Sequence, residues 1–288
     1  SFMFIMLPRA DVSANRIADV LETEVSIHDP AEPQAFARPF RPTVEFRQVS
    51  FRYPDAEEDV LHGISFTAGA GQTVGIIGTT GSGKSTVVNL IPRFYDVTGG
   101  AILVDGVDVR QVRMAELRQQ IGYIPQQSNL FSGSIESNLL FAEEGADEAA
   151  MRQALEIAQA SEFVFSGEQG LAAEVSQGGA NFSGGQKQRL AIARALVKQA
   201  PIYIFDDSFS ALDYKTDAAL RRAIHRKLGD STVFIVTQRV ATIKSADLIL
   251  VLDEGRIIDQ GTHHQLMERC EVYREIALSQ ISQAEALA

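Results

Sequence analysis

The sequence predicts an α/β fold in which a parallel β-sheet is accompanied by an antiparallel β subdomain and an inserted α-helical subdomain. Three observations lead to this prediction. A glycine-rich loop follows an apolar strand in the first third of the chain, buried strand-like runs flank a helix within residues 202–236, and residues 134–197 are patterned as helices. Strand, helix and strand in succession indicate a parallel sheet.

Composition restricts the classes of protein to which the chain can belong. Of its 288 residues, 45% are hydrophobic and 22% are charged, which is typical of a globular, soluble chain. The formal net charge of −11 argues against nucleic acid as a partner, because binding to a phosphate backbone requires clustered Lys and Arg. Cys270 is the only cysteine, so no intrachain disulfide can form and a reducing cytosol is expected.

Residues 1–42 are expected to precede the main domain. Phe2 to Leu7 is apolar but too short to span a bilayer, and the chain starts within an apolar run without an initiator Met, which suggests that it was cut from a longer one. Apolar residues at helical spacing from Asp11 to Glu24 predict an amphipathic helix. Four prolines between His28 and Pro42 predict an extended linker, and we place the domain boundary there.

Antiparallel strands are expected in the next segment. Val44 to Tyr53 alternates between apolar and polar residues with one slip, and Ile64 and Phe66 continue the pattern. Asp105-Gly106 lies between apolar residues and is a strong hairpin signal, while Ile121 to Ile124 predicts a short buried strand.

The remaining pattern predicts helices first and then a return to strands. Expected helices are Ser134 to Phe141, Asp147 to Ser161, one opening at Ser183, and Thr216 to Leu228. Expected strands are Ile202 to Phe205, Thr232 to Val236, and a hairpin of Leu248 to Leu252 with Arg256 to Gln260, after which the chain is helical to Ala288. The helical subdomain therefore covers about residues 127–198.

The glycine-rich loop carries a phosphate-binding pattern. Gly78, Gly83, Lys84 and Ser85 fill the fixed positions of G-x-x-x-x-G-K-[ST], with a further glycine at Gly81. Inward N–H groups and a helix N-terminus can solvate a polyphosphate, Lys84 can reach its β and γ phosphates, and Ser85 can offer a hydroxyl to Mg²⁺. The expected nucleotide-binding residues of the loop are Gly78, Thr79, Thr80, Gly81, Ser82, Gly83, Lys84, Ser85 and Thr86.

A pair of carboxylates supports the same chemistry. Asp206 and Asp207 follow the buried run Ile202 to Phe205, and a carboxylate at a strand end can hold the Mg²⁺ shell of a bound nucleotide. We assign this metal role to Asp206.

Asn181 to Arg189 reads N-F-S-G-G-Q-K-Q-R and closely resembles the signature motif of ATP-binding cassette (ABC) proteins. Other motifs of that family occur in order, so the resemblance covers about residues 44–280. It implies an adenine-stacking ring at Tyr53, a metal and catalytic role for Gln126, and γ-phosphate binding by Ser183, Gly184, Gly185 and Gln186. Ser210 to Asp213 matches the D-loop of the family, which implies a nucleotide-binding role for Asp213.

The resemblance also implies architecture and partners. It implies a P-loop NTPase (RecA-like) core, with an ABC nucleotide-binding domain at residues 43–280 and a C-terminal tail at residues 281–288. It implies ATP and Mg²⁺ as ligands, and two cassettes that pair head to tail. Phe2 to Glu22 resembles the end of transmembrane helix 6 of an exporter, and Leu130 to Ile135 resembles the same class. The expected location is the cytoplasmic face of the inner membrane, with a transmembrane domain in the full-length chain.

Three positions depart from the family pattern. Asp207 replaces the usual catalytic Glu, Gln238 replaces the usual His, and Ala173 to Gly179 differs from the usual T-E-V-G-E-R-G. The first two changes fall in one composite site, while the signature is intact. We therefore hypothesise a heterodimer in which this chain's own site is degenerate and hydrolyses ATP slowly, with catalytic positions at Asp207, Gln238 and Gln126. The alternatives are a non-hydrolysing regulatory ATP-binding subunit and a homodimeric exporter ATPase.

Overall fold

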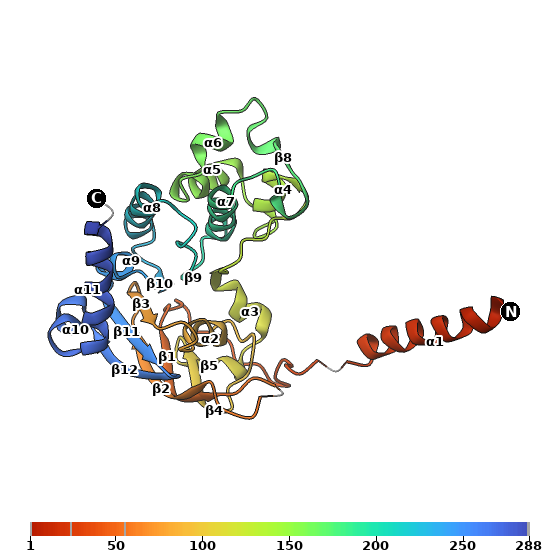
Figure 1. Cartoon of the computed structure of the whole chain (residues 1–288), viewed down its shortest axis with the longest axis horizontal. Helices are drawn as coiled ribbons and strands as arrows, with labels where there is room; N and C mark the ends of the chain where they lie inside the picture. Colours follow the sequence, from red (N-terminus) through yellow and green to blue (C-terminus); the bar gives the residue numbers. More distant parts are fainter. Residues whose placement is uncertain (1, 24, 55, 287–288) are drawn as a thin grey trace.

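The protein is described by a computed structural model that covers residues 2–23, 25–54 and 56–286. Figure 1 shows a lower lobe built on β-sheets, an upper lobe of helices, and a helix near the N-terminus that projects away from both. Within the described residues, no helix combines the length and hydrophobicity needed to cross a bilayer.

A six-stranded sheet lies at the centre of the fold. Its order is β12 (Arg256–Gly261), β11 (Leu248–Asp253), β3 (Thr73–Gly78), β10 (Thr232–Val236), β9 (Ile202–Asp206) and β6 (Ile121–Ile124). All neighbours pair in parallel except β12, which is antiparallel to β11 in the predicted hairpin. Every residue of β9 and β10 is buried, because helices or the second sheet cover both faces.

An antiparallel sheet packs beside it. Its order is β2 (Leu61–Ala68), β1 (Val44–Phe51), β4 (Gly99–Val104) and β5 (Val107–Asp108). The sequence predicted one slip in the first strand, and the register of β1 against β2 shifts twice, between Phe46 and Val49 and between Val49 and Phe51. The predicted hairpin turn is also confirmed: Asp105 and Gly106 have φ of 49° and 75°, the left-handed values that a two-residue turn requires.

The helical lobe contains α4 (Ile135–Leu140), α5 (Glu148–Ile157), α6 (Ser161–Phe165) and α7 (Gly184–Val197). The prediction of one helix from Asp147 to Ser161 is wrong at its C-terminal end, because α5 stops at Ile157 and Gln159 takes a left-handed φ of 57°. A small strand pair, β7 (Gly133–Ser134) with β8 (Glu174–Val175), was not predicted, since strands of two residues leave no alternation to detect.

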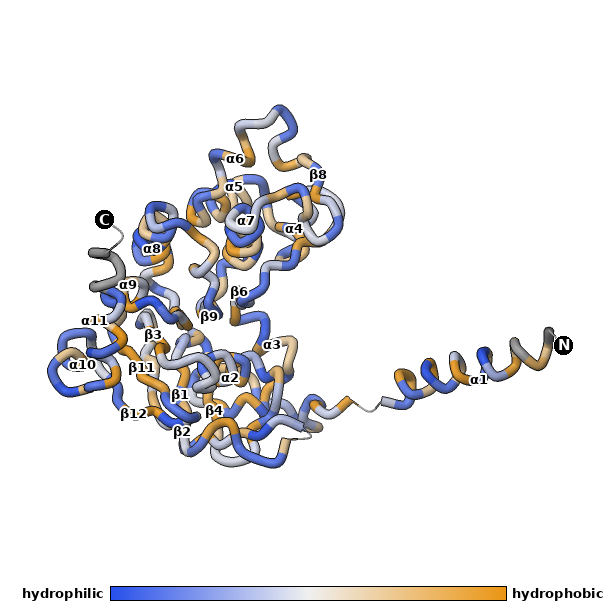
Figure 2. The backbone as a smooth tube through the Cα atoms, in the orientation of Figure 1, coloured by the Kyte–Doolittle hydropathy of each residue, from blue (hydrophilic) through white to orange (hydrophobic). Residues whose placement is uncertain are grey.

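The remaining helices flank the sheets. They are α2 (Lys84–Leu90), α3 (Met114–Gln119), α8 (Tyr214–Lys227), α9 (Val240–Ile243), α10 (His263–Arg269) and α11 (Glu271–Ala286), with short 3₁₀ turns at Val109–Gln111, Gly170–Ala172 and Gln177–Gly179. Figure 2 shows hydrophobic residues along the strands of the lower lobe, including β11. The tail expected from residue 281 is helical through Ala286, and residues 287–288 lie outside the described part.

The N-terminal helix differs from its prediction. Helix α1 spans Phe2–Leu21, so it begins well before Asp11 and continues through Pro8, because one proline removes a single main-chain donor and bends a helix without always ending it. The predicted end at Glu24 lies outside the described residues. Large apolar side chains of α1 are exposed, among them Phe4 at 85% and Val20 at 73%.

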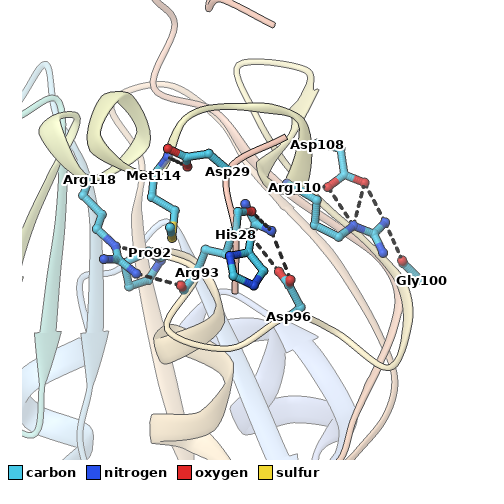
Figure 3. Close-up of polar contacts among 10 residues, drawn as sticks. All are labelled: His28, Asp29, Pro92, Arg93, Asp96, Gly100, Asp108, Arg110, Met114 and Arg118. Atoms are coloured by element: carbon cyan, nitrogen blue, oxygen red, sulfur yellow. Dashed lines mark hydrogen bonds and ion pairs between the residues drawn. The ribbon is translucent and has the colours of Figure 1, made fainter. Parts of the chain in front are cut away.

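The predicted linker forms no helix or strand where it is described, but it is held against the lower lobe (Figure 3). The buried guanidinium of Arg93 donates to the main-chain oxygen of His28 over 3.1 Å and forms a two-point pair with Asp96 over 2.7 and 3.0 Å. The carboxylate of Asp29 accepts from the N–H of Met114, the first residue of α3, over 2.8 Å. Polar contacts therefore hold the linker against the domain at His28 and Asp29.

Replacing Arg93 with methionine should lower the free energy of unfolding by about 2 kcal/mol, because hydrogen bonds to charged groups contribute about 1.5–3 kcal/mol. Arg93 is 4% exposed and holds both His28 and Asp96. Chemical denaturation measures the loss, and limited proteolysis should cleave residues 28–42 faster. The control is Arg113→Met, at an exposed arginine nearby, and equal effects of the two substitutions would contradict the assignment.

Candidate functional site

The loop after β3 is shaped by two of the motif glycines. A Cβ at Gly78 would lie 2.1 Å from the main-chain oxygen of Leu252 on β11, so only glycine allows the strands to approach at this point. Gly83 caps α2 with φ of 95°, and a Cβ there would lie 2.7 Å from Leu61. These backbone constraints turn the chain sharply from strand into helix and leave the N-terminus of α2 facing the loop.

Lys84 lies folded inside this loop. Its ammonium group donates to the main-chain oxygens of Thr79 over 2.6 Å and Gly78 over 3.1 Å, and its side chain is buried. Burial lowers the pKa of Lys84, while the nearby carboxylates of Asp207 and Asp206 oppose that shift. The loop residues Thr79, Thr80 and Gly81 are exposed, so the loop is open to a ligand on its outer side.

Asp206 ends β9 beside this loop. Its Oδ1 accepts a hydrogen bond from the hydroxyl of Ser85 over 2.8 Å, and the carboxylate is 4% exposed. Burial raises the pKa of Asp206, and hydrogen bonds from Ser85 and Tyr123 partly offset the shift. The structure thus brings together Ser85 and Asp206, two of the three residues that the sequence analysis assigned to the metal.

Asp207 has an unusual backbone. Its φ is 45°, its N–H donates to the main-chain oxygen of Val236 over 3.0 Å, and its own main-chain oxygen accepts from the hydroxyl of Ser210 over 2.8 Å. The side-chain amide of Gln126 donates to its carboxylate over 3.4 Å. Burial raises the pKa of Asp207, against the opposing charges of Lys84 and Arg239. Gln126 and Asp207 therefore face each other beside the loop.

Tyr53 lies close to the same helix. Its hydroxyl is 3.0 Å from the Thr86 hydroxyl, and its half-buried ring makes edge contacts with Phe51 and Tyr95 at centroid distances of 4.8 and 5.1 Å. The ring is thus fixed next to α2, where it can stack on a flat ligand bound at the loop.

The signature residues lie apart from the loop, at the start of α7 in the upper lobe (Figure 1). Ser183 caps α7 through a capping box, in which its N–H donates to the Gln186 side chain over 2.9 Å and its hydroxyl accepts from the Gln186 N–H over 3.3 Å. Ser183 and Gly184 are exposed, and among the described residues no hydrogen bond joins residues 183–186 to residues 78–86.

Among the described residues, two other residues predicted for the site make no hydrogen bond to Lys84, Asp206 or Asp207. Asp213 is exposed and caps α8, where its carboxylate accepts from Lys215 and Thr216; the bonds from Thr216 lower its pKa. Gln238 follows β10 and is exposed. Its main-chain oxygen accepts from Gln280 over 2.6 Å, and its side chain makes no hydrogen bond to any residue that the structure describes.

Sequence reasoning missed Tyr123 and Asn89. The hydroxyl of Tyr123 lies 2.8 Å from Asn89 Oδ1 and 3.3 Å from Asp206 Oδ2, and burial raises the pKa of Tyr123. The available signal was a residue with a polar tip inside the short buried strand that leads to Gln126.

The donor set fits Mg²⁺ and a polyphosphate. Ser85, Asp206 and Gln126 offer the hard oxygen ligands that Mg²⁺ prefers, while Lys84 and the N–H groups of the loop offer positive charge to phosphate oxygens. Bound Mg²⁺ would neutralise phosphate charge, and these residues would orient the nucleotide beside Asp207.

Comparisons with known proteins agree with this geometry. The sequence profile described as "ABC transporter" matches residues 61–210. An uncharacterized ABC transporter ATP-binding protein of Mycobacterium tuberculosis (strain ATCC 25618 / H37Rv) is 46% identical over 96% of this chain and 47% of that protein. The ATP-dependent lipid A-core flippase of Xanthomonas oryzae pv. oryzae (strain MAFF 311018) is 40% identical over 98% of this chain and 47% of the flippase.

A solved structure, that of a bacterial Atm1-family ABC exporter with ATP bound, matches with a TM-score of 0.87 and 36% identity. The match covers 97% of this chain and 48% of that one. The chain therefore spans about half the length of the relatives it matches. The predicted fold class, an α/β nucleotide-binding domain with a P-loop NTPase core, is confirmed.

Replacing Asp206 with asparagine should raise the free energy of unfolding at pH 7 in Mg²⁺-free buffer. Burial raises the folded-state pKa of Asp206, so ionisation above its ordinary pKa of 3.8 destabilises the fold. The gain should therefore be largest at neutral pH and shrink as the pH falls toward 3.8. Denaturation in EDTA at several pH values measures this dependence.

Asp213→Asn is the matched control, because it should change the free energy of unfolding in the opposite direction. The pKa of Asp213 is lowered in the folded chain, so its carboxylate stabilises the fold above pH 3.8 and the substitution should be destabilising at pH 7. That loss should disappear as the pH falls through the lowered pKa. A destabilised Asp206→Asn chain at pH 7 would show that its hydrogen bonds outweigh the cost of burial.

Proposed function

Because this chain belongs to the ABC transporter family, we propose that it is the ATP-binding domain of one half of a heterodimeric exporter, and that its own ATP site is degenerate. In this proposal the phosphate loop, with Tyr53 and Asp206, binds Mg-ATP, while Ser183, Gly184 and Gly185 complete the site of the partner subunit. ATP hydrolysis supplies the free energy for export across the membrane at whose cytoplasmic face the domain works.

The observation that carries the proposal is the side chain at position 207. Asp207 lies beside Gln126 and its backbone is held on both sides, by Val236 and by Ser210. A general base must come within about 2.6–3.2 Å of the proton that it accepts. Aspartate is shorter than glutamate by one methylene group, and a fixed backbone cannot move forward to restore the reach. Slow proton transfer is therefore expected at this site.

Gln238 supports the same conclusion. An amide can donate a hydrogen bond to a phosphate oxygen, but it cannot carry the proton or the positive charge that a histidine provides. The side chain is exposed after β10 and has no hydrogen-bond partner within the described chain, so it is available to a ligand. A site that lacks both the glutamate and the histidine keeps the residues that bind the nucleotide but lacks two groups that promote its hydrolysis.

The signature residues favour a second subunit. Ser183 and Gly184 are exposed at the N-terminus of a helix of 14 residues, and the first-turn N–H groups there suit a phosphate. They lie in the other lobe from Lys84, as Figure 1 shows for α7 and α2. The intact signature would serve a partner that carries glutamate and histidine at the two positions where this chain has Asp207 and Gln238.

The double substitution Asp207→Glu with Gln238→His should raise ATP turnover of the chain by at least about 10-fold. This is a conservative fraction of the about 10²–10⁴-fold that positioned proton transfer contributes to catalysis. Turnover is measured as phosphate release at protein concentrations high enough for two cassettes to pair, alongside nucleotide binding of both chains.

Asp207→Asn with Gln238→His is the control, because it restores the histidine without a carboxylate and should give no gain. A parent chain that hydrolyses ATP as fast as the glutamate variant would contradict the degenerate site and favour a homodimeric exporter. A natural partner that also lacks the glutamate and the histidine would contradict the heterodimer.

A further inference from the structure

Tyr123 brings a hydroxyl group to the metal-binding carboxylate from a strand that carries none of the motif residues. It lies on β6, which pairs in parallel with β9, and it stands opposite Ile204 in the register. β6 ends at Ile124, just before the loop that holds Gln126. The strand therefore connects the surroundings of Asp206 with those of Asp207.

Both oxygens of the Asp206 carboxylate have a hydroxyl group next to them. Oδ1 accepts from Ser85 over 2.8 Å, and Oδ2 lies 3.3 Å from the hydroxyl of Tyr123. Hydrogen bonds to both oxygens restrict rotation of the carboxylate plane. Because Ser85 is itself a candidate metal ligand, Tyr123 is the neighbour that can hold Asp206 in place while Ser85 turns toward a metal ion.

The proton of the phenol must be directed toward Asp206 for this to work. The hydroxyl also lies 2.8 Å from the side-chain amide of Asn89 on α2. A carboxylate can only accept, whereas a primary amide presents either an acceptor or a donor, depending on which way it is turned. In the structure the Oδ1 atom of Asn89 faces the phenol. With the amide turned over, its nitrogen would donate to the phenol oxygen and the phenol would donate to Asp206. The three residues would then form one chain of hydrogen bonds across α2, β6 and β9.

The ring of Tyr123 is held on its other side. Phe94 packs edge-on against it at a centroid distance of 5.2 Å, and the guanidinium of Arg118 covers Phe94 at 5.6 Å. Figure 3 shows how Arg118 is anchored, through donation to the main-chain oxygens of Pro92 over 3.0 Å and Arg93 over 2.9 Å. The loop after α2 therefore supports the ring, so the hydroxyl is positioned before any ligand arrives.

We propose that Tyr123 is a positioning residue for Mg²⁺ binding, which fixes the Asp206 carboxylate in the orientation that the metal requires. The inference rests on the proposed function, because it takes Mg-nucleotide as the ligand of this site. Partners that orient a metal ligand typically change metal affinity by about 10–100-fold when they are removed. Tyr123 itself touches neither the nucleotide nor the metal in this assignment.

The test is Tyr123→Phe in the full chain, since phenylalanine keeps the ring and its contact with Phe94 and removes only the hydroxyl. The probe is a fluorescent ATP analogue titrated with Mg²⁺. In EDTA, the variant should bind the analogue with the same affinity as the parent chain. The Mg²⁺ midpoint, which is the Mg²⁺ concentration that gives half of the maximal change in fluorescence, should rise by about 10-fold, the lower end of the usual range. A purely structural loss would lower both affinities together.

Tyr203→Phe is the matched control. Tyr203 lies on the adjacent strand β9, is fully buried, and bonds through its hydroxyl to the N–H of Ala200 over 3.0 Å and the oxygen of Leu196 over 3.4 Å. Its loss should leave the Mg²⁺ midpoint unchanged. Asn89→Ala is a second test, because it removes the group that directs the phenol proton, and it should raise the midpoint by a smaller factor.

An unchanged midpoint in Tyr123→Phe, an equal shift in Tyr203→Phe, or a midpoint that does not rise in Asn89→Ala would overturn the inference. These outcomes are distinct from failure of the proposed function, because the midpoint is an equilibrium quantity and the degenerate site is judged by turnover. Fast turnover with a shifted midpoint overturns the degenerate site alone. A parent chain without Mg²⁺-dependent binding overturns both.

Discussion

The structure depends on holding three ionisable groups together in a buried place. The Lys84 ammonium lies close to the carboxylates of Asp206 and Asp207. Burial lowers the pKa of Lys84 and raises the pKa of both carboxylates, so it favours the neutral form of each group. Each group has polar partners nearby: Lys84 has loop carbonyls, Asp206 has hydroxyl groups, and Asp207 has the amide of Gln126. The sheet order explains how they meet. β10 separates β3 from β9, so the loop between Gly78 and Lys84 must carry the chain across the end of β10 to bring Ser85 to Asp206, and α2 contacts all three strands.

In the proposed function the two lobes have different tasks: the lower lobe binds the nucleotide, and the upper lobe completes the nucleotide site of the partner subunit. The charged cluster belongs to the lower lobe, whereas Ser183 is presented by the N-terminus of α7 in the upper lobe (Figure 1). The capping box between Ser183 and Gln186 shapes this end of the helix without help from the phosphate loop. A preformed and exposed helix end is suited to a ligand held by another chain, which is why the proposed function needs a second subunit.

Local sequence signals predicted the elements that are set by local physics. The Asp105-Gly106 turn needs left-handed φ values, and the strands β9 and β10 need continuous apolar runs, so both could be predicted from a few adjacent residues. Tyr123 could not be predicted in this way, because its contact with Asp206 joins residues 83 positions apart and a single tyrosine has no spacing to detect. The contact of Arg93 with His28 spans 65 positions and was missed for the same reason.

The backbone of Asp207 shows why one methylene group can matter more than composition suggests. Left-handed φ values are uncommon outside glycine, and aspartate and asparagine tolerate them better than longer side chains do. A glutamate at this position would therefore extend its carboxylate further but would strain the backbone more. Asp207 strains the backbone less, but its carboxylate extends less far. The hydrogen bonds to Val236 and from Ser210 hold the backbone in place, so a shift of the main chain cannot make up for the shorter side chain. In the proposed degenerate site, slow hydrolysis would follow from the same backbone geometry that favours aspartate at position 207.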